Sequence, residues 1–343
     1  MNRNSGIVFL RLLATIGVIG DHVPLCSISQ TNVDVTSSEQ FLYKSMAMAN
    51  HWPVPVFMMI TGYLLLQKNK LDYKTIWKYF KRIAIVLLLF GFAFSMVEVY
   101  FVSHAITLDR IMTAFVNVIE GHTWEHMWYL YVLLGIYLVL PLLQKNAPPT
   151  HKGTLIILTC LVLIFTSLLP SFGVKFGIKF PINSVYVGYV CLGYLTYVFM
   201  DKLKSAKGHN ALFVVTALLS FIPIVIAEYQ EYVCNNKLTI DLTSYTSFVI
   251  VIQSVAIFNL VMTNSSIFNK ISEWWIIKRF DRCSFGIYII HMLWINIAIK
   301  LFHVDIVQYN NLILVPVGIA AVFILSWIST EAMLKIPVLK KYL

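Results

Sequence analysis

The chain has 343 residues, of which 59% are hydrophobic, 14% aromatic and only 12% charged, and its mean hydropathy is +0.76. These polar side chains are too few to cover a water-facing surface, so a soluble enzyme is excluded. The net charge of +10 would suit a nucleic-acid partner only if the basic side chains shared one exposed face, which this hydrophobic background does not allow.

Apolar runs of about twenty residues, the length that crosses a bilayer as a helix, predict ten spans. They lie near residues 7–27, 45–66, 83–103, 127–144, 154–171, 182–200, 211–228, 244–263, 283–302 and 312–334. We therefore expect an all-α integral membrane protein, a single transmembrane domain over residues 1–343 built as one bundle of about ten helices. No cleavable signal peptide is indicated, because the first run is long, contains an arginine and lacks a small-x-small site.

The basic residues predict the orientation of the bundle. Most of the 26 Lys and Arg residues fall in segments that an inside N-terminus would place in the cytoplasm, above all residues 67–82. The predicted outer segments hold only Lys44, Arg110, Lys175, Lys179 and Lys237. The positive-inside rule then predicts that both termini are cytoplasmic, with outer loops at 28–44, 104–126 and 229–243. We expect a multi-pass protein of the cell membrane, with the lipid bilayer and not nucleic acid as its surroundings.

Five ionisable side chains fall at membrane depth: Arg11, Asp21, His22, Glu98 and His291. Charged groups inside a bilayer are costly, so each is a candidate functional residue. At 100° per residue, the spacing of Arg11 and His22 places them on one stripe of the first helix, roughly 16 Å apart along its axis. We expect both to face one cavity, with Arg11 toward the cytoplasm; snorkelling of Arg11 to the lipid headgroups is the alternative.

His22 is the strongest catalytic candidate, because histidine can act as a general base near neutral pH. A histidine hydrogen-bonded between helices is the alternative. Asp21 points about 100° away on the helix and would not form a dyad with His22. Glu98, in the outer part of the third span, could bind a polar substrate or reach the interface. His291, in the run FGIYIIH near mid-depth, is a second candidate.

Four segments carry a resemblance to a known family. They are FLRLLATIGVIGDHV (9–23), VPVFMMITGYLLL (54–66), HMWYLYVLLGIYLVLPLL (126–143) and FGIYIIHMLWI (285–295). In this order and spacing they resemble acyltransferase family 3, a family of integral membrane enzymes with a ten-helix unit. The resemblance implies transfer of an acyl group, usually acetyl from acetyl-CoA as co-substrate, to a hydroxyl of an extracytoplasmic or lipid-linked polysaccharide. No bound cofactor is implied.

Carried over residue by residue, the resemblance assigns Arg11 and His22 to the family's basic-x10-His motif, in which the histidine is taken as catalytic. His291 matches the histidine of the late GIYLIHP-like segment. His126 matches the histidine of an HLWFLY-like segment.

The family's R-x-x-R pair at the start of the third helix is not preserved. The run WKYFKRIAIVLLLF offers Lys78 and Lys81 in one register, or Tyr79 and Arg82 in the other. Lys78, Lys81 and Arg82 could bind the phosphates of a CoA donor by charge-assisted hydrogen bonds. Positive-inside anchoring is the alternative role of these cations.

Two mechanisms are compatible with the sequence. Neutral His22 could take the proton of the acceptor hydroxyl as that oxygen attacks the thioester, or His22 could attack first and form a transient acyl-imidazole. Thr61 and Tyr63 are weak candidates for stabilising the oxyanion, with helix packing as their alternative role.

A competing motif occurs at His122-Thr-Trp-Glu125-His126, which has the H-x-x-E-H spacing of a zinc protease. Gly121 interrupts a helix there and no third ligand is suggested, so no metal is predicted; the segment is expected to line the acceptor entrance or to anchor at the interface. The odd number of cysteines without C-x-x-C predicts neither a zinc ribbon nor a disulfide framework.

A multi-span transporter or flippase of a lipid-linked sugar is the alternative function, although no duplicated half is visible.

Overall fold

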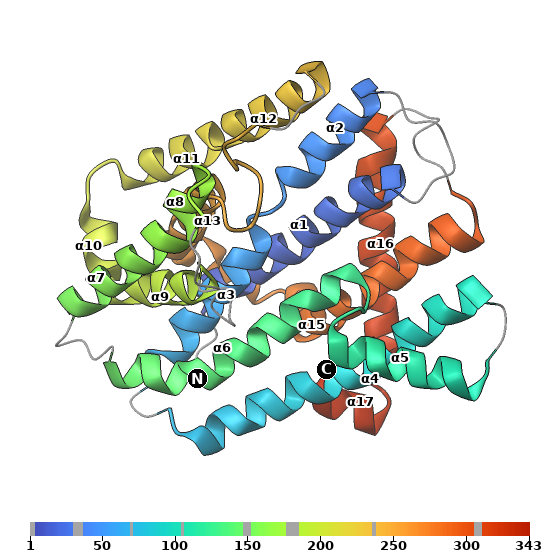
Figure 1. Cartoon of the computed structure of the whole chain (residues 1–343). Coiled ribbons are helices and arrows are strands. Elements are labelled where there is room, and N and C mark those ends of the chain that lie inside the picture. Colours follow the sequence, from blue (N-terminus) through green and yellow to red (C-terminus); the bar gives the residue numbers. More distant parts are fainter. Residues whose placement is uncertain are drawn as a thin grey trace.

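The structure is a computed structural model that describes residues 4–29, 37–68, 71–103, 106–146, 152–175, 185–234, 238–304 and 311–343. Within these ranges every regular element is a helix (Figure 1). The α-helices are α1 (Ser5–Ser29), α2 (Ser37–Met48), α3 (Pro53–Leu65), α4 (Tyr73–Ser103), α5 (Leu108–Glu120), α6 (Trp128–Asn146), α7 (Lys152–Leu163), α8 (Leu169–Ser171), α9 (Val185–Val198), α10 (Met200–Ser205), α11 (His209–Leu219), α12 (Phe221–Cys234), α13 (Phe248–Thr263), α14 (Asn269–Ser272), α15 (Trp275–Asn296), α16 (Asn311–Met333) and α17 (Pro337–Tyr342). Short 3-10 or π turns are η1 (Glu125–Met127), η3 (Ile164–Leu168), η4 (Ser265–Phe268) and η5 (Ile297–Leu301).

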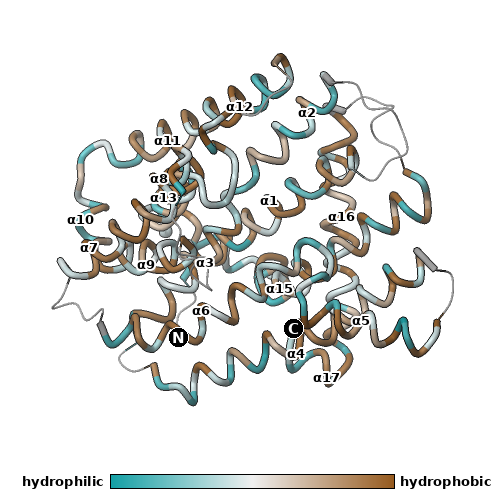
Figure 2. The backbone as a smooth tube through the Cα atoms, viewed as in Figure 1, coloured by the Kyte–Doolittle hydropathy of each residue, from teal (hydrophilic) through white to brown (hydrophobic). Residues whose placement is uncertain are grey.

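The all-helical membrane fold is confirmed. Among the described residues, seven helical stretches are long and apolar enough to cross a bilayer, or eight if the pair Phe248–Thr263 and Ser265–Ser272, bent by 66°, counts as one span. In Figure 2 the helices carry long hydrophobic stretches, whereas hydrophilic residues gather at many of their ends and connections. The chain is therefore a multi-pass membrane protein.

The count of ten spans is not confirmed, and two segments account for much of the difference. The predicted span 45–66 is divided into α2 and α3 by a break before Pro53, since proline lacks the N–H that a continuous helix needs. The predicted span 182–200 contains α9, an apolar helix of only 14 residues. Both segments are apolar, but neither forms one helix of full spanning length.

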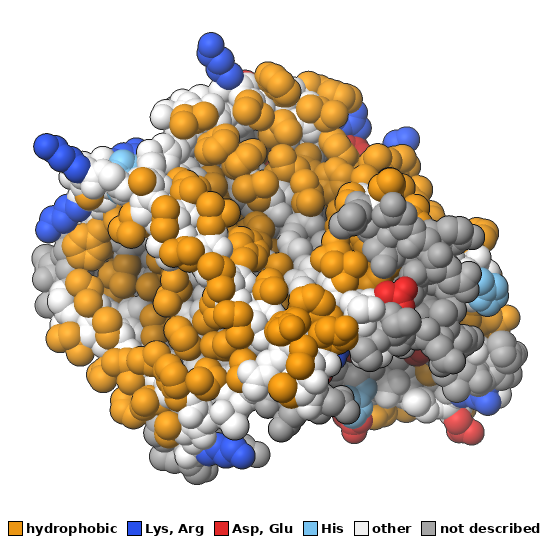
Figure 3. Space-filling model, turned by 90° about the horizontal axis from the view of Figure 1, so that it is seen from above, with side chains coloured by type: hydrophobic (Ala, Val, Ile, Leu, Met, Phe, Trp, Pro, Cys, Tyr) orange, Lys and Arg blue, Asp and Glu red, His pale blue; other side chains and the backbone are white. Residues whose placement is uncertain are grey.

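Helix α1 lies at the centre of the bundle. Of the 18 residues that form its apolar membrane-spanning segment, 72% are buried. In the stretch His209–Cys234, which holds α11 and α12, the corresponding share is 17%. The face seen in Figure 3 is covered mainly by hydrophobic side chains, with Lys and Arg at its edges. Exposed apolar residues of this kind are expected where lipid surrounds the protein.

Two glycines bring α3 and α9 into backbone contact. A Cβ added at Gly62 would lie 1.8 Å from the carbonyl oxygen of Val190, and one added at Gly193 would lie 2.0 Å from that of Met59. Small residues permit this approach in membrane helices, where dispersion contacts hold the pair together. The contact keeps α3 against the inner helices.

The predicted outer loop 104–126 contains a helix, α5, that the hydropathy of the sequence does not predict. Helix α5 buries Ala114 and Val118, while its other apolar side chains, among them Leu108, Met112 and Ile119, are exposed. Its C-terminus is closed by Gly121, whose φ of 82° favours glycine. A short helix of this pattern is suited to the membrane interface.

Candidate active site

A cavity of about 290 Å³ opens between α1, α3, α4, α6 and α15. Its charged and hydroxyl-bearing lining comes from the side chains of Arg11, Arg82, Arg282, Asp281, Thr61 and Ser284, with tyrosines beside them. Three guanidinium groups accompany the side-chain carboxylate of Asp281 and the main-chain oxygen of Leu343, so the cavity has a surplus of positive charge. We call it the arginine pocket; it suits an anionic ligand with several acceptor oxygens.

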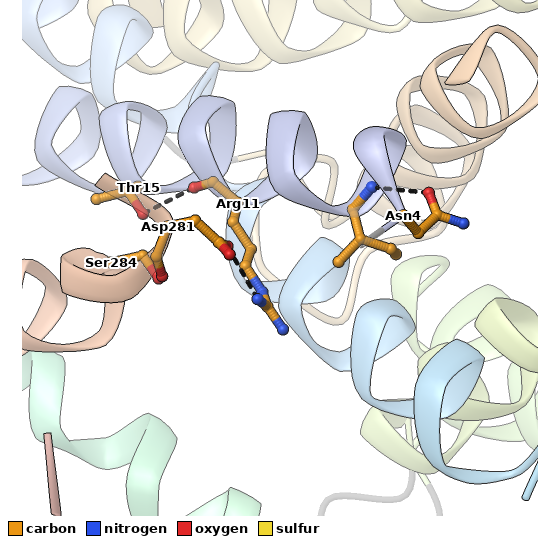
Figure 4. Close-up of polar contacts among 6 residues, drawn as sticks. Asn4, Arg11, Thr15, Asp281 and Ser284 are labelled. Carbon is orange, nitrogen blue, oxygen red and sulfur yellow. Dashed lines mark hydrogen bonds and ion pairs between the residues drawn. The ribbon is translucent and has the colours of Figure 1, made fainter. Parts of the chain in front are cut away.

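Arg11 is bound across the bundle to α15. Its Nη1 donates a hydrogen bond to Asp281 Oδ1 at 2.9 Å, and the hydroxyl of Thr15 donates to the Arg11 carbonyl at 2.7 Å (Figure 4). The side chain of Arg11 remains 31% exposed, whereas that of Asp281 is 5% exposed. Asp281 therefore orients the guanidinium, which lines the pocket with further donors.

Of the predicted donor-binding cations on α4, Arg82 alone lines the arginine pocket. Its Nε donates to the carbonyl of Tyr342 at 2.7 Å and its Nη2 to the main-chain oxygen of Leu343 at 2.6 Å. Lys78 and Lys81 are exposed and do not line the cavity, and the Lys81 ammonium lies over the ring of Trp77. Of the two alternative registers predicted for the family's R-x-x-R pair, the one with Tyr79 and Arg82 therefore places its cation in the pocket.

Three histidines from separate elements meet deeper in the bundle: His22 of α1, His126 of η1 and His291 of α15. The ring centroids of His22 and His291 are 5.3 Å apart, and those of His126 and His291 are 5.0 Å apart. Their exposed fractions are 8%, 1% and 0% in that order. We call this group the histidine cluster; the predicted candidates His22 and His291 are neighbours in it.

Backbone carbonyls determine which nitrogen carries the proton in two of these rings. His126 Nε2 lies 3.0 Å from the carbonyl oxygen of Ile289, and His291 Nδ1 lies 2.6 Å from that of Tyr288. Because a carbonyl only accepts, each of these nitrogens donates. The opposite nitrogens, His126 Nδ1 and His291 Nε2, and also His22 Nδ1, are buried without a partner among the described residues. The cluster therefore holds three buried ring nitrogens that are available to a polar group that reaches them.

Tyr288 separates the arginine pocket from the histidine cluster. Its side chain lines the pocket, its ring centroid is 5.9 Å from His291 and 5.8 Å from His126, and its hydroxyl donates to the His126 carbonyl. His22 does not line the pocket. The predicted stripe on α1 thus runs from Arg11 in the arginine pocket to His22 in the histidine cluster, and Tyr288 contacts both.

A second buried polar network lies around Asp21. The hydroxyl of Tyr245 donates to Asp21 Oδ2 at 3.0 Å, and His51 Nε2 is 3.6 Å from Asp21 Oδ1. His51 also contacts the carbonyl of Thr243 through Nδ1 at 2.5 Å. His51 is not among the candidates predicted from the sequence. Pro53, two residues later, does indicate the helix break between α2 and α3 in which His51 lies.

The remaining candidates separate into different surroundings. Thr61 lines the arginine pocket, and its hydroxyl donates to the Phe57 carbonyl at 3.0 Å. Tyr63 lies outside the pocket, with its ring centroid 5.5 Å from that of Tyr197, so its surroundings favour the packing role. Glu98 binds Lys300 and Trp124 near the far end of α4.

The H-x-x-E-H segment does not form one helix. Helix α5 ends at Glu120, and the 3-10 turn η1 begins only at Glu125. The exposed side chain of His122 lies 3.3 Å from Glu120, whereas His126 is buried in the histidine cluster. Within the described part of the chain, no three His, Cys, Asp or Glu side chains are grouped as a metal site would require.

One comparison with known proteins identifies the family of this chain. A family model described as an acyltransferase domain, Acyl_transf_3, matches residues 4–331. No curated protein and no solved structure matches the chain. Since the family model covers the pocket, the histidine cluster and nearly the whole bundle, the chain belongs to acyltransferase family 3 and is a membrane acyltransferase.

Proposed function

We propose that this protein is an O-acetyltransferase of the cell membrane that moves an acetyl group from cytoplasmic acetyl-CoA to a hydroxyl of an extracytoplasmic or lipid-linked polysaccharide. One observation carries the proposal: a pocket with three arginines at one end of α1 is followed, along the same helix, by a buried histidine cluster. The first suits a polyanionic donor and the second suits proton transfer to or from a hydroxyl.

The donor end is argued from charge. CoA carries phosphates, and guanidinium groups bind phosphate oxygens through paired N–H donors. Arg11 is oriented for this by Asp281. The pantetheine arm would extend from the pocket past Tyr288 toward His22, which lies about 16 Å beyond Arg11 along the helix.

The chemical step follows from the histidine cluster. Neutral His22 takes the proton of the acceptor hydroxyl, the oxygen bonds to the thioester carbonyl, and the carbon–sulfur bond breaks as CoA leaves and regains a proton. His291 Nε2 is unprotonated in the neutral ring and has no hydrogen-bond partner among the described residues, so His291 is a second candidate base. Initial attack by His22 on the thioester, with loss of CoA, would form an acetyl-imidazole, and the acceptor hydroxyl would then take the acetyl group from the imidazole nitrogen; this route uses the same groups.

The proposal is tested with the full chain in lipid nanodiscs, radiolabelled acetyl-CoA, and the surface polysaccharide of the producing cells after mild alkali has removed its ester groups. We expect label to enter the polysaccharide with the parent protein and not with His22→Ala. Mass spectrometry of surface glycans from cells with and without the gene should show an acetyl-sized difference. Unlabelled polysaccharide, together with a sugar-lipid moved across the membrane, would instead support the transporter or flippase alternative.

A further inference from the structure

A cluster of three side chains lies at the end of the bundle opposite the arginine pocket. Glu98 of α4 accepts from Lys300 Nζ at 3.0 Å through Oε1 and at 2.9 Å through Oε2. The indole Nε1 of Trp124 donates to Glu98 Oε2 at 3.1 Å. We call Glu98, Trp124 and Lys300 the Glu98 cluster; we propose that it is the binding site for the carbohydrate acceptor, an inference that rests on the proposed function.

The first argument is position along the helices. Arg82, which lines the arginine pocket, and Glu98 lie on one continuous helix, and their spacing corresponds to about 24 Å. On the continuous stretch of α15 and η5, His291 lies midway between Asp281 of the pocket and Lys300 of the Glu98 cluster. The histidine cluster is thus between the two sites, as a transfer between ligands from opposite sides requires.

The second argument is continuity with the histidines. The ring of Trp124 stacks on Phe94 with centroids 4.4 Å apart and an interplanar angle of 11°. The ring of Phe94 lies 5.8 Å from His126, which is itself a neighbour of His291. A sugar bound at Trp124 would therefore be only a few side chains from His22.

The third argument is accessibility. The side chain of Glu98 is 42% exposed and that of Lys300 is 28% exposed, and Trp124 is partly exposed. Lys300 projects from the π-helical turn η5, a local distortion that is frequent at functional sites. A ligand can reach all three groups without unfolding the bundle.

The fourth argument is chemical. A pyranose offers hydroxyls that both donate and accept, together with an apolar ring face. Glu98 accepts hydrogen bonds, Lys300 donates them, and Trp124 supplies an aromatic plane with a polar N–H at its edge. A half-exposed Lys–Glu pair contributes only about 0–1 kcal/mol to stability, so holding α4 to η5 is a weak reason for this combination. Recognition of a polyhydroxylated ligand accounts for all three residue types.

The test measures acceptor saturation in nanodiscs with the alkali-treated polysaccharide as probe and acetyl-CoA held saturating. We expect Trp124→Ala and Lys300→Met to raise the acceptor KM by about tenfold or more, with kcat within about threefold of the parent. The dissociation constant of CoA, measured by calorimetry, should not change. Trp124→Phe, which keeps a six-membered aromatic ring on Phe94 and loses the indole N–H together with its five-membered ring, covers the case in which Trp124→Ala fails to fold.

Lys44→Met is the matched control. Lys44 forms a 2.8 Å ion pair with Glu231, and the two side chains are 32% and 28% exposed. An unchanged acceptor KM in folded Lys300→Met and Trp124→Phe, or an equal rise in Lys44→Met, would overturn the inference while leaving the proposed function intact. A parent protein that binds CoA but transfers no acetyl group to the polysaccharide would overturn the proposed function, and this inference with it.

Discussion

Arg11→Ala tests the donor site most directly, but in this structure the substitution also affects the buried side chain of Asp281. Asp281 is 5% exposed, and Arg11 is its hydrogen-bonded ion-pair partner. Removing Arg11 therefore deletes a donor-binding cation and leaves a buried carboxylate without that partner. A loss of CoA binding in Arg11→Ala alone would not distinguish these two effects. The double variant Arg11→Ala/Asp281→Asn also removes the charge of Asp281 and isolates the contribution of Arg11 to binding.

The two effects have different magnitudes. A hydrogen bond to a charged group contributes about 1.5–3 kcal/mol, which corresponds to a loss of roughly tenfold to a hundredfold in CoA affinity. The loss of one charged partner by a buried carboxylate costs about 1–3 kcal/mol of stability or more. Because the Arg11 side chain is 31% exposed, water screens part of the pair, and we expect the stability loss near the lower end of that range.

Calorimetric titration with CoA and thermal unfolding are measured on the parent, Arg11→Ala, Asp281→Asn and the double variant. We expect Arg11→Ala and the double variant to lose CoA affinity equally, and the double variant to recover most of the unfolding midpoint. Asp281→Asn keeps Arg11, retains an amide oxygen that can still accept from Arg11 Nη1 and orient it, and removes a carboxylate from the pocket, so it should bind CoA at least as tightly as the parent. Parent-like CoA affinity in the double variant would refute the donor role of Arg11.

Four further predictions follow from the site and the packing. Folded His22→Gln should bind CoA normally and lose about a hundredfold to ten-thousandfold of the transfer rate; near-normal transfer would shift the catalytic role to His291. Gly62→Ala should lower the unfolding midpoint, because its Cβ would meet a backbone carbonyl of α9 at 1.8 Å, whereas Gly153→Ala, where the Cβ meets nothing within 4 Å, should not. A cysteine at Lys74 should be protected from an impermeant thiol reagent in intact cells, and labelling there would contradict the cytoplasmic placement of residues 67–82. His122→Ala should leave transfer largely intact and purified protein should hold no stoichiometric zinc; one zinc per chain, lost together with activity in that variant, would restore the protease interpretation.

The sequence by itself determined the class of protein and the positions along single helices. Low charge and long apolar runs are properties of composition, and they require burial in lipid whatever the helices pack against. The alignment of Arg11 with His22 depends only on the helical period, which is local. Pro53 shows why hydropathy does not determine the number of spans. One proline divides an apolar run into two helices without changing the hydropathy of that run.

Tertiary structure decided which groups meet. Asp281 reaches Arg11 from α15, His291 reaches both His22 and His126, and Lys300 reaches Glu98, each across a large separation in sequence. Helical periodicity indicates which residues share a face but not which helix that face meets. That choice depends on close contacts such as Gly62 against α9 and on the path of the connections, which a single sequence does not encode locally. The separation of the arginine pocket from the histidine cluster by Tyr288 likewise arises only when α15 packs beside η1.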